Sequence, residues 1–285
     1  MHQSAPSKVA LKSVLAAGFL TTLKIVVGFQ SGSLGILAEA AHSALDLIAA
    51  FITLWAVKLS AKPADQEHHF GHGKFESISA LIETILLWIT CSWIVYEAVM
   101  RLTGTAKAEI EPSIWAFGVL GISIVVDFFR SRDLDHHAKL YDSPALAADA
   151  LHFKTDILAS LAVMIGLIGV IFGFEWADGA AALAVAGWTF FHSLHIAREA
   201  FDQLTDRAPS GMEEKIQAIL SRIPSISAIK SLRIRKAGAN SFIDLTVCLP
   251  KDLTFEHAHQ ITEEIEAAIR INYPRAEISV HAEPV

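Results

Sequence analysis

Two segments of this chain carry the same pattern of ionisable residues inside otherwise apolar sequence. In each, an acid is followed after three residues by a histidine and after four more by an aspartate: Glu39, His42 and Asp46, then Asp149, His152 and Asp156. Four residues make about one helical turn, so each histidine shares a helix face with its aspartate. Ionisable groups in long apolar helices are costly to bury, and they therefore indicate a functional site.

The chemistry that this pattern favours is metal binding. Imidazole nitrogens and carboxylate oxygens are ligands of Zn²⁺, which takes four of them in a tetrahedral site. The two segments supply that number and kind of ligand in His42, Asp46, His152 and Asp156. Both ligand types lose protons when a metal binds, so a proton returning to the site helps to expel the ion. Polar groups that only hydrogen-bond across a helix bundle are the alternative.

The elements that must position these residues are membrane-spanning helices. Of the 285 residues, 53% are hydrophobic, against 45–50% in soluble proteins, and the excess lies before about residue 205. Six apolar segments have the roughly 20 residues needed to cross a bilayer. They run over about 9–29, 34–59, 78–100, 113–129, 145–172 and 176–196. We therefore expect a membrane domain, residues 1–208, followed by a soluble domain, residues 209–285.

The distribution of lysine and arginine predicts the orientation of the membrane domain. These residues gather in the loops and ends on one side, which places both termini in the cytoplasm. The second and fifth segments then run in opposite directions. Side by side, they place His42 level with Asp156 and Asp46 level with His152.

The two acids that begin the repeated pattern are predicted to act as relays. Glu39 and Asp149 each lie one turn from a histidine and on the same face. With the two helices antiparallel, Glu39 points toward the outside and Asp149 toward the cytoplasm. A simple charge near a helix end is the alternative for each.

A histidine-rich loop between the second and third segments is a second candidate metal site. Asp65, His68 and His72 follow one another at spacings of three and four residues. Short histidine-rich tracts often bind metals. A solvated loop without a ligand role is the alternative.

The pattern of the last 77 residues predicts a small α+β domain. Helices are predicted over 212–223 and 255–273, and strands over 228–235, 242–249 and 277–281. Histidines in this part, His259 and His281 among them, form a third candidate site with Glu283. Surface histidines without a ligand role are an equal alternative.

Other functional classes are disfavoured by what the sequence contains. The net charge is −7, without a basic patch of the kind that binds nucleic acid, and two cysteines are too few for a disulfide framework. A haem protein ligated by His42 and His152 is disfavoured by the carboxylates one turn away. A zinc hydrolase would need a His-Glu-x-x-His helix. We therefore expect a protein that is not an enzyme and has no organic cofactor. A membrane metal sensor or scaffold that does not transport ions is the alternative.

The residues also resemble those of a known family, the cation diffusion facilitators, over nearly the full chain. The resemblance is carried by Ser33-Leu34-Gly35 before His42 and Asp46, by 62–65 and 70–76 in the loop, and by His152 with Asp156. It implies a homodimer in the lipid of a bacterial inner membrane, whose substrates are divalent metal ions and protons. The implied activity is export of Zn²⁺ from the cytosol in exchange for protons by alternating access, with Cd²⁺, Fe²⁺ and Mn²⁺ as alternative ions.

The same resemblance implies roles for particular residues. It implies a transport site at His42, Asp46, His152 and Asp156, a loop site at Asp65, His68 and His72, and a charge pair between Lys74 and Asp206 at the dimer contact. The soluble domain is similar to a metallochaperone (ferredoxin-like) fold that dimerises and senses metal.

Three positions depart from the family pattern. His42 stands where bacterial relatives often have aspartate, and the added nitrogen favours Zn²⁺ over Mn²⁺ or Fe²⁺. Lys230 and Thr246 stand where some relatives have histidines, so His259, His281 and Glu283 are expected to hold one ion rather than two.

Overall fold

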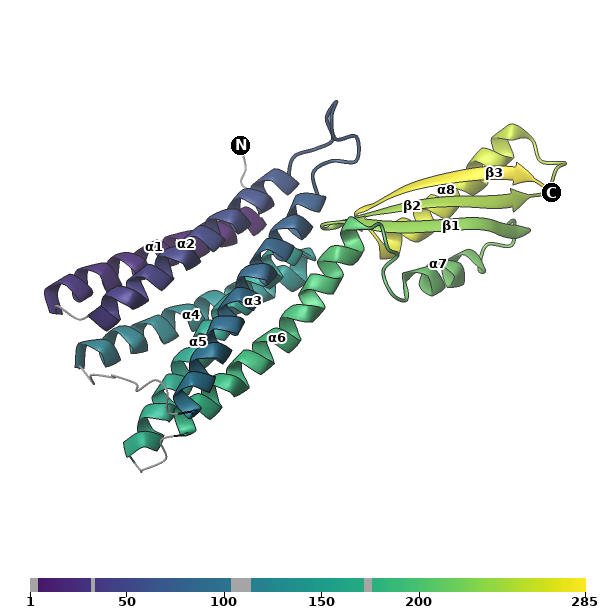
Figure 1. Ribbon diagram of the computed structural model, residues 1–285. Helices are drawn as coiled ribbons and strands as arrows, with labels where there is room; N and C mark the ends of the chain where they lie inside the picture. The colour runs from purple at the N-terminus through teal and green to yellow at the C-terminus, as the bar shows by residue number, and fades with distance from the viewer. Residues whose placement is uncertain (1–4, 32–33, 104–113, 172–175) are drawn as a thin grey trace.

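Six long helices form a bundle, and a small α+β domain extends from one end of it (Figure 1). The structure, a computed structural model, describes residues 5–31, 34–103, 114–171 and 176–285. The bundle helices are α1 (Ala5–Ser31), α2 (Leu34–Ser60), α3 (Lys74–Leu102), α4 (Ile114–Tyr141), α5 (Pro144–Ile171) and α6 (Ala177–Leu204). The six predicted segments are therefore all helical, and the predicted fold class is confirmed.

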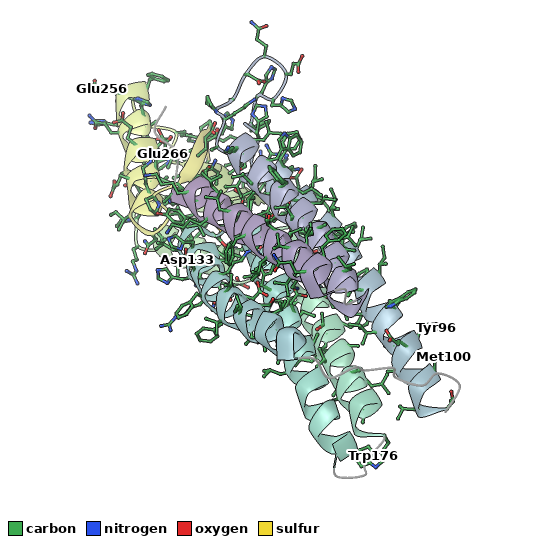
Figure 2. The ribbon with its side chains drawn as sticks, turned by 90° about the vertical axis from the view of Figure 1, so that its left-hand side faces the viewer. Tyr96, Met100, Asp133, Trp176, Glu256 and Glu266 are labelled. Atoms are coloured by element: carbon green, nitrogen blue, oxygen red, sulfur yellow. The ribbon has the colours of Figure 1, made fainter. Side chains whose placement is uncertain are left out.

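Hydropathy marks four of these helices as spans within the described residues. They are Ala5–Gln30, Ala40–Ser60, Lys74–Met100 and Gly179–Leu204. The helix α4 continues about twelve residues beyond the predicted apolar segment. Ion pairs between residues one turn apart stabilise this extension of the helix. In one of them, Lys139 Nζ lies 2.6 Å from Asp135 Oδ2. Figure 2 places Asp133 of α4 near the small domain and Trp176 at the opposite end of the bundle.

The two helices that carry the repeated pattern run in opposite directions. The hydroxyl of Ser60, the last residue of α2, donates a hydrogen bond of 2.6 Å to Oε1 of Glu76. The hydroxyl of Ser143, just before α5, donates to Oε2 of the same carboxylate. Because α2 ends where α5 begins and the two helices are in contact, their repeated segments face each other.

Small side chains let the bundle helices approach closely. Ala80, Ala148 and Ala200, from α3, α5 and α6, are at most 1% exposed and pack together. A second cluster joins α1, α2, α4 and α5 around Phe153 and Leu146. Helix interfaces within membranes favour such small residues, because burial of apolar surface does not drive association there.

The C-terminal domain contains the elements predicted from the sequence. It consists of α7 (Met212–Leu220), β1 (Ala228–Ala237), β2 (Asn240–Leu249), α8 (Phe255–Asn272) and β3 (Ala276–Pro284). The sheet order is β1-β2-β3, with β1 antiparallel and β3 parallel to β2. Alternate residues of β2, such as Ile243, Leu245 and Val247, pack with Ile216 of α7 and Ile265 of α8 in one core.

The loop between α2 and α3 docks on the hairpin between β1 and β2. The ring of Phe70 contacts both the Arg235 guanidinium, 4.1 Å from its centroid, and the Phe242 ring, 5.4 Å away edge to face. Gly73 approaches the hairpin so closely that a Cβ there would clash with the carbonyl oxygen of Ala237. This contact connects the histidine-rich loop directly to the C-terminal domain.

We expect Phe70→Ala to loosen the hairpin. Loss of the aromatic pair and the cation–π contact removes about 1–2 kcal/mol of interaction. Hydrogen–deuterium exchange of residues 236–240 should become several times faster. The matched control is Phe255→Ala, because Phe255 is 89% exposed and stacks only on His259 among its described ring contacts. Equal exchange of the hairpin in both variants would contradict the docking role.

Candidate metal centre

The first candidate site assembles from α2 and α5 in the pairs expected from antiparallel helices. His152 Nε2 lies 3.0 Å from Asp46 Oδ1, and His42 Nε2 lies 3.9 Å from Asp156 Oδ1. Along each helix, His42 Nε2 is 3.9 Å from Asp46 Oδ1 and His152 Nε2 is 3.8 Å from Asp156 Oδ2. The structure therefore brings Asp46, His152 and Asp156 into one group, with ligand atoms within 4.8 Å of one another. His42 lies beside this group, near both of its carboxylates.

These separations suit a small divalent cation. Two ligand atoms about 2 Å from a tetrahedral Zn²⁺ lie roughly 3.3 Å apart, and the four distances between a histidine and an aspartate of the site run from 3.0 to 3.9 Å. The side chains of His152 and Asp46 are 8% and 11% exposed, whereas that of His42 is 43% exposed. An ion there would thus be enclosed more tightly on the side of His152 and Asp46 than on the side of His42.

This group is surrounded by polar residues that were not predicted from the sequence to belong to a site. The ammonium of Lys24 donates to the hydroxyl of Ser43 at 2.8 Å. Arg130 lies over the ring of Phe153, 3.3 Å from its centroid, and is itself buried. Glu83 of α3 is 1% exposed. The signal that could have identified Glu83 was present, since it is an ionisable residue inside the third apolar segment.

Of the two predicted relay residues, the structure describes the side chain of Asp149 only. The side chain of Glu39 lies outside the described residues. Asp149 is fully buried, and its Oδ2 accepts a hydrogen bond of 2.9 Å from the hydroxyl of Ser13. The same hydroxyl accepts a hydrogen bond of 2.8 Å from Nε of Arg130. Asp149 is therefore linked to α1 and, through Ser13, to α4.

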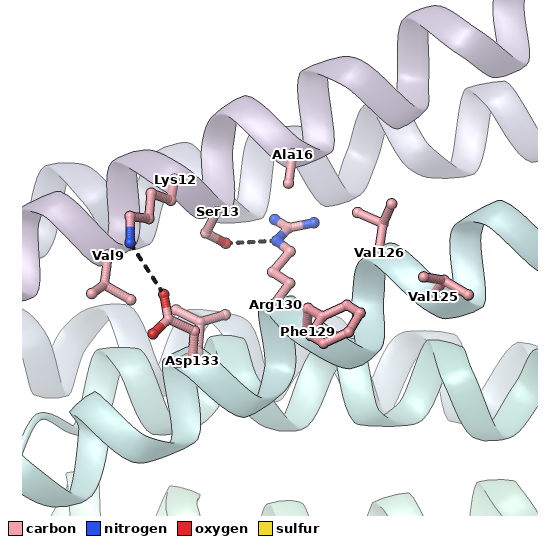
Figure 3. A pocket seen from close by; sticks show the side chains of 10 residues that line it. Val9, Lys12, Ser13, Ala16, Val125, Val126, Phe129, Arg130 and Asp133 are labelled. Atoms are coloured by element: carbon pink, nitrogen blue, oxygen red, sulfur yellow. Dashed lines mark hydrogen bonds and ion pairs between the residues drawn. The ribbon is translucent and has the colours of Figure 1, made fainter.

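A cavity of about 340 Å³ lies between α1 and α4 beside this link (Figure 3). Figure 3 shows Ser13 and Arg130 facing each other across it. Its lining also includes Lys12 and Asp133, whose charged groups are 3.8 Å apart. The rest is mostly apolar, with Val9, Val126 and Phe129 among its residues.

The histidine-rich loop forms the second group. Asp65 Oδ2 lies 3.3 Å from His72 Nε2, and Asp65 Oδ1 lies 3.5 Å from His68 Nδ1. A tight turn holds the carboxylate, because the backbone N–H groups of His68 and Glu67 donate to Asp65 Oδ1 at 2.7 and 3.0 Å. These hydrogen bonds, the one from His68 most, lower the pKa of Asp65. The carboxylate is therefore ionised at neutral pH, as a metal ligand must be.

The third candidate site is not assembled within the single chain. His281 Nε2 lies 3.8 Å from Glu283 Oε1, but His259 is beside Glu263, at 3.6 Å. The Lys230 ammonium donates to Glu283 at 2.5 Å and lowers the pKa of that carboxyl. Within the described residues, the groups of three potential ligands are those of the loop and of α2 with α5. A metal site at His259, His281 and Glu283 stays a prediction.

The predicted charge pair is present inside the chain. Lys74 Nζ lies 2.9 Å from Asp206 Oδ1, and Arg235 Nη1 lies 3.5 Å from the same oxygen. The hydrogen bond from Lys74 is the main cause that lowers the pKa of Asp206. The pair joins the start of α3 to the residue after α6, and its place at a dimer contact stays a prediction.

Comparison with known proteins identifies two matching regions. Residues 10–205 match the family described as "Cation efflux transmembrane domain", and residues 208–285 match "Cation efflux protein, cytoplasmic domain". "Cation-efflux pump FieF" of Serratia proteamaculans (strain 568) is 31% identical over 281 residues, which cover 96% of this chain and 91% of the relative. Its counterpart from Cronobacter sakazakii (strain ATCC BAA-894) is 29% identical, with 98% and 92% covered.

Solved structures match over the C-terminal domain. The Zn form of CzrB is 28% identical, covers 27% of this chain and 90% of that chain, and has a TM-score of 0.26. A variant of the MamM CTD in a cadmium form is 26% identical, covers 27% and 96%, and also has a TM-score of 0.26.

Proposed function

Because this chain belongs to the cation diffusion facilitator family of cation-efflux transporters, we propose that it exports Zn²⁺ from the cytosol in exchange for protons. It is an integral membrane protein that transports divalent metal ions. In our proposal both termini are cytoplasmic and the membrane is a bacterial inner membrane. Residues 1–208 carry the ion, and residues 209–285 dimerise the protein and sense metal.

The single observation that supports this proposal best is the crosswise pairing of α2 with α5. Each helix contributes one imidazole and one carboxylate, and the bonded pair His152–Asp46 and the facing pair His42–Asp156 share one location. Two nitrogens and two carboxylate oxygens suit Zn²⁺ better than Mn²⁺ or Mg²⁺, which prefer sites made of oxygen alone. Cd²⁺ and Fe²⁺ are the alternative cargoes for such a ligand set.

Proton exchange follows from the same ligands. An imidazole and a carboxylate must be deprotonated to bind the ion, so rising proton concentration releases it. Alternating access then requires that the site open to one side at a time. Glu39 on one side and Asp149 on the other are proposed to relay protons toward and away from the site.

The loop and the C-terminal domain are assigned secondary roles. Asp65, His68 and His72 are proposed to hold a second ion, next to the contact that connects the loop to the β1–β2 hairpin. Lys74 and Asp206 are proposed to stabilise the dimer where the two domains join. His259, His281 and Glu283 are proposed to hold a regulatory ion.

We expect His72→Ala to reduce the number of metal ions bound per chain by one. His72 is 6% exposed and supplies an imidazole nitrogen that lies close to Asp65, so the remaining pair cannot enclose an ion. Equilibrium dialysis with Zn²⁺ measures the change. The matched control is His69→Ala, because His69 lies in the same loop and its ring bonds only the carbonyl oxygen of Gln66 among the described contacts. Equal metal content in the two variants would show that the loop does not hold an ion.

The transport proposal is tested in proteoliposomes that contain a zinc-sensitive dye. An acidic lumen should drive Zn²⁺ into the vesicles as protons leave, and a protonophore should abolish the effect of the gradient. Mn²⁺ and Cd²⁺ are compared in the same vesicles. Zn²⁺ entering at the same rate with and without a proton gradient would contradict antiport, and no flux of any ion would favour a sensor or scaffold.

A further inference from the structure

Two buried carboxylates lie beside the proposed transport site and are not among its ligands. Glu83 of α3 is 1% exposed and Asp149 of α5 is 0% exposed. Glu83 Oε1 accepts a hydrogen bond from the Thr53 hydroxyl of α2, and Asp149 Oδ2 accepts one from Ser13 of α1. Their other oxygens, Oε2 and Oδ1, are buried and have no hydrogen bond of standard geometry among the described residues, although the Ser79 hydroxyl, one turn away, lies close enough to act on Glu83.

Glu83 and Asp149 lie on neighbouring helices that pack together, because Ala80 of α3 and Ala148 of α5 belong to one cluster of buried residues. Glu83 lies within electrostatic range of both Asp149 and His152, and Asp149 lies within range of His152 and Asp46. The Nδ1 atom of His152 is likewise buried with no partner in the part of the chain that the structure describes. Glu83, Asp149 and His152 therefore each have one buried polar atom without a hydrogen-bond partner among the described residues, and the three side chains interact electrostatically.

Arg130 is the cation that acts on Asp149, but other acids, among them Asp127 and Asp156, share its charge. Arg130 of α4 reaches Asp149 through the hydroxyl of Ser13 and lies 3.8 Å from a second acid, Asp127. The hydrogen bond to Glu83 comes from the neutral hydroxyl of Thr53. Two carboxylates that share a buried site cannot both be ionised without a large cost, so one proton between them is the favourable state.

We propose that Glu83 and Asp149 share a proton, and that a metal ion arriving at the transport site expels it. This inference rests on the proposed function and adds a proton-binding pair to it. The O–H bond of the shared carboxylic acid breaks, and the proton passes to water. The driving force is the field of two added positive charges close by in a low-dielectric interior, which stabilises both carboxylates.

The surroundings of Asp149 give that proton a way out that avoids the metal ligands. The Ser13 hydroxyl bonds Asp149 on one side, and Ser13 lines the cavity between α1 and α4 on the other (Figure 3). A hydroxyl can accept and donate a proton in turn. The ion and the proton thus need not share a path.

The experiment counts the protons that the full-length protein releases when it binds Zn²⁺. Titration calorimetry in buffers of different ionisation enthalpy gives this number for protein in detergent. In the variant Glu83→Gln, the count should fall by up to about one proton per ion, while Zn²⁺ still binds. Glutamine keeps an oxygen that accepts from Thr53, so folding should be maintained, and Glu83→Asp should restore most of the lost count.

Glu76→Gln is the matched control. Glu76 is also a buried glutamate of α3, but its partners are Ser60 and Ser143 at the end of the bundle, and its count should equal that of the wild type. An unchanged count in Glu83→Gln, with Zn²⁺ binding that still requires Asp156, would overturn this inference and leave the transport site intact. Zn²⁺ binding that does not require Asp156 would instead overturn the proposed function.

Discussion

Asp156→Ala is expected to abolish Zn²⁺ transport in proteoliposomes. Asp156 supplies one of four ligands, and its carboxylate lies 3.9 Å from His42 Nε2 and 3.8 Å from His152 Nε2. Its loss leaves three ligands with a single negative charge for a dehydrated divalent ion. Since even residues that only orient a ligand contribute 10–100-fold to metal affinity, we expect affinity to fall by at least about a hundredfold.

The effect should come from the site and not from misfolding. Asp133→Ala is the matched control, because Asp133 is an aspartate of the neighbouring helix α4 that lies near the C-terminal domain (Figure 2) and pairs with Lys12. Both variants should elute from a sizing column at the same volume as the wild type. Zn²⁺ flux at the wild-type rate in Asp156→Ala would refute the assignment of this site.

The second large effect is expected on metal selectivity. His42→Asp replaces a nitrogen ligand by a carboxylate, which suits oxygen-preferring ions such as Mn²⁺. We expect the preference for Zn²⁺ over Mn²⁺ to fall by roughly tenfold or more, because the site becomes richer in hard ligands. The measurement is the ratio of the two transport rates at equal ion concentrations.

The control for selectivity is the same substitution at a histidine outside the bundle. His257 of α8 is exposed, and His257→Asp should leave the ratio of rates unchanged. If His42→Asp also left the ratio unchanged, His42 would not be a ligand of the transported ion.

The repeated pattern of the sequence was sufficient to predict the arrangement of α2 and α5. A spacing of four residues fixes which side chains share a helix face, and opposite helix directions then pair His42 with Asp156 and Asp46 with His152. The structure places the four residues in those pairs. The elements of the C-terminal domain were predictable for a similar reason, because alternation along β2 and the Thr254 cap before α8 are local signals.

Contacts between distant helices were not predictable in this way. The bond between Thr53 and Glu83, and the position of Arg130 over Phe153, depend on which helix faces meet in the bundle. A single sequence does not contain that information. The ion pair between Lys230 and Glu283 is a further example, because it depends on how β1 and β3 lie on either side of β2.

Zinc K-edge X-ray absorption tests the central claim most directly. The sample is the His72→Ala variant loaded with one equivalent of Zn²⁺, so that the loop does not compete for the ion. We predict four nitrogen or oxygen ligands at about 2.0–2.1 Å, two of them imidazoles, and the loss of one imidazole when His42→Ala is added. A six-oxygen shell, or a spectrum that His42→Ala leaves unchanged, would contradict a shared ion between α2 and α5.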